Sequence, residues 1–459
     1  MNDYYRKILI LGGIGICSLG AYAQQKPLYI KEGLALVQSS QPQMKVYEEQ
    51  AKSSQYNVKL AKNTLLPDLN IGYQAGYATY NNITGMSYPG FMLPISGPPS
   101  SGNIYDPVPG TAAGAMVKWN PLTFGQRNAA IEKATAQYKL ANSTYNDALF
   151  RQQYATISVY LDAVYLQKLM QTYQANINRT STGLQQSLVF TREGLRPGID
   201  TTQFQSALAQ AKTDLLIVQR QYYAQLAELS RLTGLPDPPE NLLLADTSLL
   251  IQLPQVADTM AGPSANPVYQ YYQLKKEVTA TSLKEVNRTW RPKLDLWANA
   301  YARGSGVGAD GAIDKASGWS LSRKNYGAGV QISFPILQFS EVQLKKKQYS
   351  ALLKADEAQL DQVALNLQKQ KETARYNFDQ NILITKQAVI QSQAARFAYD
   401  GLTLSYASGL IDFTRLIQGQ YDLLKAETGE AAAYLQAWRA LLDIAVANGQ
   451  LTTFTDNLK

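Results

Sequence analysis

The chain has 459 residues, of which 45% are hydrophobic and only 17% are charged, and its formal net charge is +8. It contains no histidine, the commonest general base and metal ligand, and its one cysteine, Cys17, can form neither an internal disulfide nor a thiolate metal site. We therefore expect no catalytic residue, no cofactor and no metal. The densest basic cluster, Lys345–Lys347, is too short for a nucleic-acid arm. It is expected to be a solvated helix face, with contact to anionic lipid as the alternative.

Residues 1–23 have the pattern of a secretory signal peptide. A basic pair precedes the short apolar run Ile8–Leu19, and Ala21–Ala23 supplies the small-x-small cleavage pattern. A retained membrane anchor is the alternative, although the apolar run is short for a membrane span. Lipidation of Cys17 is disfavoured because Ile16 stands where a small residue is expected. The protein is therefore expected to work beyond the inner membrane.

The rest of the chain contains one unit twice. Landmarks of the first copy recur in the same order in the second: Pro42 with Pro267, Pro67 with Pro292, Trp119 with Phe334, and Gly194 with Gly409. Such self-similarity indicates a duplicated supersecondary unit. We expect a signal peptide at 1–23, a first repeat at 24–235, a proline-rich linker at 236–266 and a second repeat at 267–459.

Each repeat is expected to contain helix, strand, loop, strand and helix. No proline occurs from Gln126 to Arg196, and none follows Pro335. A helix of roughly 65 residues would be about 100 Å long, which compact domains rarely contain. The apolar stripes are narrow, as in helices that pack side by side in a coiled-coil-like bundle. Helical periodicity alone leaves a plain coiled-coil structural protein open as an alternative.

Four segments alternate between apolar and mostly small or polar residues: Leu69–Tyr77, Ala113–Trp119, Leu294–Ala300 and Tyr326–Phe334. Strands of about ten residues with this alternation are typical of transmembrane β-barrels. Four strands are too few for a conducting barrel, so several chains are expected to share one. Aromatic residues near the strand ends would form its interfacial girdles: Tyr80, Trp119, Trp290 and Phe334. A soluble two-sheet core is the alternative.

This ordered set of features resembles the TolC-like outer-membrane efflux proteins. The resemblance covers nearly all of the chain after residue 23. It also rests on the strand-exit segment Trp119–Gly125 and on two helical hairpin turns, Arg192–Leu195 and Tyr406–Leu410. It implies a mainly α-helical fold with a β-barrel part: a homotrimer in which four strands per chain make a twelve-stranded barrel and the helices form an α-barrel tunnel. It further implies location in the outer membrane with extension into the periplasm, and passive conduction in a tripartite efflux or type I secretion system.

The implied partners are two further copies of the chain, outer-membrane lipid, a periplasmic adaptor (membrane fusion) protein and an inner-membrane pump. In the family the adaptor docks at the periplasmic tip of the hairpins. Here that tip would be formed by Gly194 and Leu195 in the first turn and by Gly409 and Leu410 in the second. Glycine supplies the positive φ that such a reversal needs.

Residues just after the turns are candidates for capping and gating. Asp200 and Asp412 stand where the following helix needs an N-cap or first-turn acid. Some family members place gating carboxylates beyond the second turn, but here Arg415 and Gln418 occupy those places. We therefore expect Asp412, Arg415 and Gln418 to line a gate in which Arg415 makes a cationic constriction or an inter-helix tie.

Two other functions compete with a channel. A periplasmic coiled-coil scaffold or adaptor would explain the helices but would leave the alternating strands unexplained. An enzyme, for instance a carboxylate-based glycosidase, is disfavoured because no cluster of acids converges in the sequence. The sequence leaves open whether the cargo is a drug, a metal cation, a siderophore or a protein.

Overall fold

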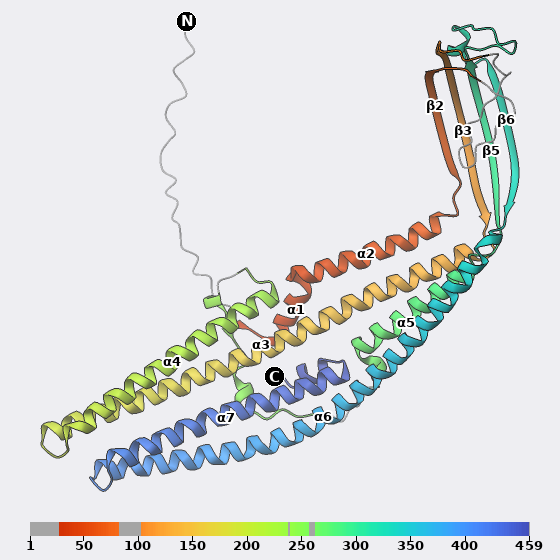
Figure 1. The fold of residues 1–459 in the computed structure, drawn as a ribbon. Coiled ribbons are helices and arrows are strands. Elements are labelled where there is room, and N and C mark those ends of the chain that lie inside the picture. Colours follow the sequence, from red (N-terminus) through yellow and green to blue (C-terminus); the bar gives the residue numbers. More distant parts are fainter. Residues whose placement is uncertain (1–26, 82–101, 237–238, 257–261, 459) are drawn as a thin grey trace, which may run out of the picture. The chain divides into compact units, whose positions relative to one another are not determined.

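The protein was described from a computed structural model that covers residues 27–81, 102–236, 239–256 and 262–458 (Figure 1). The predicted signal peptide lies outside these residues, as does most of the loop between the first two predicted strands. Long helices dominate the part of the chain that is described. None of the described helices combines the length and the apolar character needed to cross a membrane.

The first half of the chain contains β1 (Pro27–Leu28), α1 (Ile30–Ser40), α2 (Pro42–Asn63), β2 (Asp68–Ala78), β3 (Val108–Leu122), α3 (Gln126–Arg192) and α4 (Gly198–Thr233). The connecting stretch contains η1 (Pro239–Asn241), β4 (Leu243–Leu244), η2 (Thr247–Leu250) and η3 (Pro263–Ala265). The second half contains α5 (Pro267–Val286), β5 (Lys293–Ser305), η4 (Ser317–Trp319), β6 (Arg323–Ser333), η5 (Ile336–Gln338), α6 (Phe339–Ala407), α7 (Phe413–Asn448) and α8 (Thr452–Thr455). Both halves therefore follow the order helix, strand, strand, long helix, shorter helix.

The chain forms two compact units, and each takes segments from both halves. The helical unit consists of the described residues of Met1–Pro42, Arg151–Thr259 and Lys371–Lys459. The sheet unit consists of those of Gln43–Phe150 and Met260–Gln370. The sequence repeats are thus not separate compact domains, and their predicted boundaries stay a prediction about the sequence.

In the sheet unit, four strands form one antiparallel sheet in the order β2-β3-β5-β6 (Figure 1). Residues directly opposite one another on neighbouring strands lie on the same face. The register gathers the apolar residues of all four strands on one face: Leu69, Ile71, Tyr73 and Tyr77 from β2; Ala113, Ala115 and Val117 from β3; Leu294, Leu296 and Ala298 from β5; Tyr326, Val330 and Ile332 from β6. Much of this face is uncovered, since Ile71 is 79% and Tyr326 92% exposed.

The other face of the sheet is mostly polar or glycine. It carries Asp68, Asn70, Gly72 and Gln74 from β2; Gly114, Met116 and Lys118 from β3; Asp295, Trp297 and Asn299 from β5; Asn325, Gly327, Gly329 and Gln331 from β6. One chain therefore supplies a two-faced open sheet whose edges are β2 and β6. The predicted strands are present, but the described strands do not close into a barrel within one chain.

Three of the four predicted girdle aromatics lie at the same end of the sheet. Trp119 is near the end of β3, Trp290 lies in the turn before β5, and Phe334 directly follows β6. Because these strands are antiparallel, all three positions belong to the helix-proximal end, where Trp119 Nε1 donates a hydrogen bond to Leu65 O at 2.8 Å. Tyr80 follows β2 and therefore lies toward the opposite end.

In the helical unit, α3 with α4 and α6 with α7 form two long hairpins. Buried polar groups fix the helices to one another. Gln420 Nε2 on α7 donates to Asn176 Oδ1 on α3 at 2.8 Å, and Thr385 Oγ1 on α6 donates to Ala433 O at 3.0 Å. Hydrogen bonds of this kind set the relative register of packed helices, because a buried group left without a partner is costly.

Tyr160 ties the connecting stretch to α3. Its hydroxyl donates to Leu28 O at 2.8 Å and accepts the N–H groups of Ala245 and Asp246, each at 3.2 Å. The Asp246 carboxylate in turn accepts the N–H of Ile30 at 2.9 Å. Burial, reinforced by the Asp246 charge, raises the pKa of the Tyr160 hydroxyl well above its ordinary value. The hydroxyl therefore stays a donor, and β1 and β4 remain fixed against α3.

Replacing Tyr160 with Phe should lower the free energy of unfolding by about 1–3 kcal/mol, because the Asp246 N–H loses its acceptor and the Leu28 carbonyl keeps only the Ala245 N–H as a donor. The matched control is Tyr154→Phe on the same helix, since Tyr154 is 37% exposed and its hydroxyl has no partner among the described residues. That control should change stability by less than about 0.5 kcal/mol. Thermal unfolding in detergent followed by circular dichroism measures both. Equal midpoints for the two variants would contradict the assigned role of Tyr160.

Candidate functional site

Both hairpins of the helical unit reverse through the same backbone motif. Gly194 and Gly409 have φ values of +69° and +73°, in the left-handed region that favours glycine. Leu195 N donates to Phe190 O at 2.8 Å, and Leu410 N donates to Ser405 O at 2.9 Å. These are the six-to-one bonds of a Schellman motif, which ends a helix by satisfying its last carbonyls.

Each turn presents one large apolar side chain to its surroundings. Leu195 is 69% exposed and Leu410 is 78% exposed. The glycines beside them have open space where a Cβ would stand, so the backbone conformation rather than crowding requires glycine there. The two turns therefore expose a pair of leucines at the ends of the hairpins.

A set of three polar residues, called here the tip cluster, joins the two hairpins just behind the turns: Arg196, Asp200 and Tyr406. Arg196 Nη2 donates to Tyr406 O at 3.2 Å and to Ile411 O at 2.9 Å. Its guanidinium lies 4.4 Å from the centre of the Tyr406 ring and 3.9 Å from Asp200 Oδ2. Tyr406 donates its hydroxyl hydrogen to Asp200 Oδ2 at 3.2 Å.

The tip cluster sits on a buried aromatic core. Phe204 packs edge-on against Phe413 with ring centres 4.6 Å apart, and against Tyr406 at 6.1 Å. Tyr406 is only 1% exposed. Burial and the neighbouring Asp200 charge raise the pKa of Tyr406 to about 12, so its hydroxyl remains a donor at neutral pH. The arrangement can hold the two hairpins together through a few polar contacts shielded from water.

The two acidic residues after the turns have different roles. Asp412 is the N-cap of α7, and its carboxylate accepts the N–H of Arg415 at 2.9 Å. Asp200 is not an N-cap, because α4 starts at Gly198 after Pro197 and Asp200 already lies in the first turn. Its carboxylate instead receives the Tyr406 hydroxyl. Asp200 follows its turn glycine Gly194 three residues later than Asp412 follows Gly409, and the helix start at Gly198 leaves Asp200 inside the first turn.

The predicted gate residues lie on the exposed side of α7. Gln418 Nε2 donates to Asp422 Oδ1 at 3.0 Å, and Arg415 is exposed. The Arg415 guanidinium has no hydrogen bond or ion pair within the described part of the chain. Within one chain Arg415 is therefore a free cation rather than an inter-helix tie.

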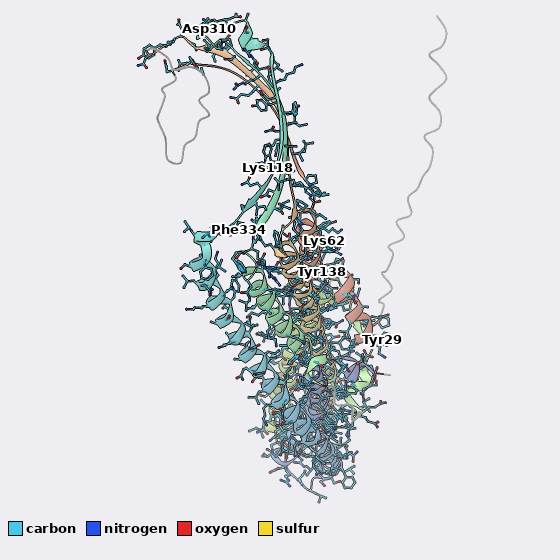
Figure 2. The ribbon with its side chains drawn as sticks, turned by 90° about the vertical axis from the view of Figure 1, so that its right-hand side faces the viewer. Tyr29, Lys62, Lys118, Tyr138, Asp310 and Phe334 are labelled. Carbon is cyan, nitrogen blue, oxygen red and sulfur yellow. The ribbon has the colours of Figure 1, made fainter. Side chains whose placement is uncertain are left out.

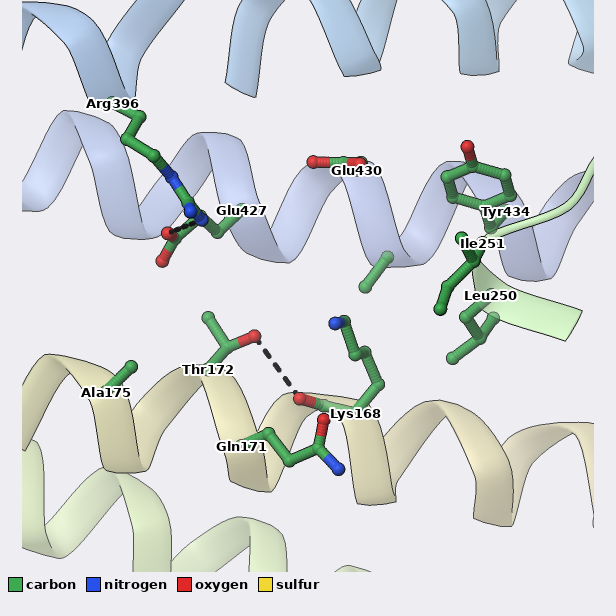
Figure 3. Close-up of a pocket in the computed structure, with 11 residues that line it drawn as sticks. Lys168, Gln171, Thr172, Ala175, Leu250, Ile251, Arg396, Glu427, Glu430 and Tyr434 are labelled. Atoms are coloured by element: carbon green, nitrogen blue, oxygen red, sulfur yellow. Dashed lines mark hydrogen bonds and ion pairs between the residues drawn. The ribbon is translucent and has the colours of Figure 1, made fainter. Parts of the chain in front are cut away.

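The sequence analysis did not identify a second polar cluster, which lies farther from the two turns than the tip cluster does. Glu427 on α7 accepts two bonds from Arg179 on α3, at 3.2 and 2.8 Å, and one from Arg396 on α6 at 2.8 Å. Figure 3 shows this carboxylate beside an open hollow of about 280 Å³ that Lys168, Glu430 and Tyr434 also line. The charges in the hollow balance, which suits a structural tie among three helices rather than a reaction site.

No group of three or more His, Cys, Asp or Glu side chains that could hold a metal ion exists among the described residues. The missed residues Arg196, Tyr406 and Glu427 had no sequence signal of their own, because each gains its role from a partner on another helix. The sequence did contain one partial signal for Asp200. Pro197 and Gly198 start α4 before Asp200, so Asp200 cannot be its N-cap.

Comparison with known proteins finds a family model that matches part of the chain. Residues 34–235 match the model of a family described as outer membrane efflux protein. The sequence finds no match among curated proteins.

Solved structures share the fold over most of the chain. The outer membrane protein VceC of Vibrio cholerae is 14% identical with a TM-score of 0.72, over 92% of this chain and 96% of that one. The CmeC outer membrane channel of Campylobacter jejuni is 11% identical with a TM-score of 0.72, over 92% and 85%. The MtrE outer membrane channel of Neisseria gonorrhoeae, in its open state, is 13% identical with a TM-score of 0.69, over 92% and 89%.

The family model and the shared fold agree with the resemblance carried by the sequence, and they confirm the expected location in the outer membrane with a helical part in the periplasm. The family and its structural neighbours are channel proteins rather than enzymes. Residues 34–235 therefore match the outer membrane efflux protein family, and 92% of the chain shares the fold of solved outer membrane channels.

Proposed function

We propose that three copies of this chain form a passive outer-membrane channel of a tripartite efflux or secretion system. The observation that carries the proposal is the two-faced sheet with open edges at β2 and β6. In hydrocarbon every backbone N–H and C=O needs a partner, so β6 of one copy would pair with β2 of the next until twelve strands close. The apolar face would then meet lipid and the polar face would line the pore.

The helical hairpins would continue the pore as a tunnel, and the turns at Gly194 and Gly409 would form its periplasmic tip. The exposed Leu195 and Leu410 suit docking by a periplasmic adaptor, since exposed leucines at a helix end gain from burial. Direction and energy would come from an inner-membrane pump. The described residues of the chain contain no group of three or more His, Cys, Asp or Glu side chains that could hold a metal ion.

A periplasmic scaffold or adaptor remains the competing function. A water-soluble protein rarely leaves a large apolar patch uncovered, and here the apolar face includes Ile71, Tyr326 and Val330, which are 79%, 92% and 65% exposed. The uncovered face therefore favours a lipid-embedded channel over a soluble scaffold.

The purified protein should require detergent, migrate as a trimer after chemical cross-linking, and conduct ions in planar bilayers. Fractionation should place it with outer-membrane markers. The physical reason is the same for all three results: the sheet can satisfy its edges only in a closed ring and its apolar face only in lipid. A monomer that stays soluble without detergent and shows no conductance would favour the scaffold.

The tip cluster would hold the tunnel in a closed state. Arg196 joins the first turn to two carbonyl oxygens of the second, and Tyr406 joins the second hairpin to Asp200 of the first. These contacts are few and polar, so an adaptor that binds the turns could shift the balance between closed and open hairpins by its differential affinity.

Replacing Arg196 with Ala should raise the open probability of reconstituted channels at least about tenfold, because hydrogen bonds to a charged group contribute about 1.5–3 kcal/mol. Single-channel recording measures this directly. The matched control is Arg192→Ala, since Arg192 belongs to the same turn region but is exposed and has no partner among the described residues. Equal open probability in both variants would show that Arg196 does not stabilise the closed state.

Replacing Arg415 with Ala should make the channel less selective for anions, because three copies of an unpaired guanidinium near the axis attract anions to a constriction. The reversal potential in a salt gradient measures the change. Lys386→Ala, which removes an exposed cation from α6, serves as the control and should leave the potential unchanged. If Arg415→Ala shifts neither conductance nor reversal potential, Asp412, Arg415 and Gln418 do not line the gate.

A further inference from the structure

The polar face of the sheet carries more cations than carboxylates. The register places Lys118, Lys293, Arg303 and Arg323 on this face, against Asp68 and Asp295. Asp295 already accepts a hydrogen bond from Asn120 Nδ2 at 2.9 Å. A surface with this excess attracts anions, and the attraction is stronger where the surface is concave and encloses little water.

Two large aromatic residues of β5, Trp297 and Tyr301, lie on the same polar face, and Trp297 is the one whose ring lies over glycines of β6. Trp297 is on β5, and its register partner on β6 is Gly329. A Cβ built on Gly329 would stand 2.7 Å from Trp297 Cζ2 and 2.8 Å from Cε2, and one built on Gly327 would stand 3.4 Å from Cζ3. Opposite ends of the indole therefore lie over two successive glycines of the same face. The ring extends along β6 with one side against the strand and its other side toward the space over the polar face.

Lys118 is the register partner of Trp297 on the other neighbouring strand, β3. Paired residues on one face have Cβ atoms about 4.5–5.5 Å apart. Lys118 is exposed and has no hydrogen bond or ion pair among the described residues, and Figure 2 shows it partway along the sheet. This row of the sheet contains Asp68, Lys118, Trp297 and Gly329 in order. The Lys118 ammonium stands beside the indole and makes no ion pair with Asp68.

We propose that Trp297 and Lys118 form a subsite for planar aromatic anions on the wall of the pore. The ring of the solute stacks on the open side of the indole, and its carboxylate or other anionic group pairs with the Lys118 ammonium. The subsite rests on the proposed function, because the polar face becomes a pore wall only when several sheets close. Three such subsites would occur in a trimer.

The simpler explanation is that Trp297 only covers the glycines of β6, as aromatic residues do beside glycine in other sheets. That explanation accounts for the position of the ring but assigns nothing to the unpaired Lys118 or to the cationic excess. It also predicts that the ring matters for stability alone. A measurement on the conducting channel separates the two explanations.

The experiment records ion current through the reconstituted wild-type channel while 2-naphthoate is added on the exterior side, and measures the concentration that blocks half the current. We expect block by 2-naphthoate and much weaker block by cyclohexanecarboxylate, which has the charge without the planar ring. Trp297→Leu should raise the half-blocking concentration of 2-naphthoate about tenfold, whereas Trp297→Phe should raise it less, because stacking of an aromatic ring is lost only in the first.

Lys118→Gln should also weaken block by 2-naphthoate but leave block by the neutral 2-naphthylmethanol unchanged. Tyr326→Leu is the matched control, because it removes a ring from the apolar face of the same sheet, where the side chain is 92% exposed. It should change neither blocker. Lys118 is exposed and makes no hydrogen bond or ion pair among the described residues, so its variant decides the question even if Trp297→Leu fails to fold.

Conduction with equal 2-naphthoate block in wild type, Trp297→Leu and Lys118→Gln would overturn the subsite and leave the channel intact. Equal block by 2-naphthoate and cyclohexanecarboxylate would overturn it as well. A wild-type protein that does not conduct would overturn the channel and the subsite together.

Discussion

Backbone hydrogen bonding at the two edges of the sheet is the constraint on which the proposed assembly depends. β2 and β6 each extend over 11 residues, and within one chain each pairs on one side only. An exposed edge in water invites aggregation, and in lipid it is too costly to persist. The apolar face is not covered by the rest of the chain, since Ile71 and Tyr326 are 79% and 92% exposed. Closure with other copies is the arrangement that satisfies both the edges and the face at once.

The helical unit follows a different principle, because its polar contacts are few and local. Burying charges such as those of Arg196 and Asp200 costs free energy that their mutual attraction only partly offsets. A tie of this kind adds little to stability but fixes one arrangement of the hairpins over another. It is therefore suited to a state that a binding partner must be able to release.

The sequence predicted the features that depend on periodicity. Alternation located the four strands, and the absence of proline located the 67-residue α3 and the 69-residue α6. Glycine and the following leucine marked both turns. It did not reach roles that depend on a partner from another helix: Asp200 was predicted as an N-cap or first-turn acid and lies in the first turn of α4, but only the position of Tyr406 shows that its carboxylate also accepts a hydrogen bond from the other hairpin. The alternation within one strand also does not say which residue of the neighbouring strand it pairs with. The pairing of Lys118 with Trp297 was therefore not predictable.

Because the chain contains two repeats, equivalent residues of the two copies can be compared. The comparison distinguishes residues that maintain the backbone from residues with a proposed function. Residues with equivalents in both copies, such as the prolines before β2 and β5 and the glycines of the turns, maintain the shared backbone. The turn leucines Leu195 and Leu410 occur in both copies, but other proposed functional residues lie where the copies differ in residue or in contacts. With Pro67 aligned to Pro292, Trp297 corresponds to Gly72, which has open space around its Cα. Asp200 and Asp412 correspond, yet only Asp412 caps its helix. Two unlike repeats in each chain can thus share one backbone geometry. The proposed assembly would then contain the tip cluster and the Trp297–Lys118 subsite once per chain.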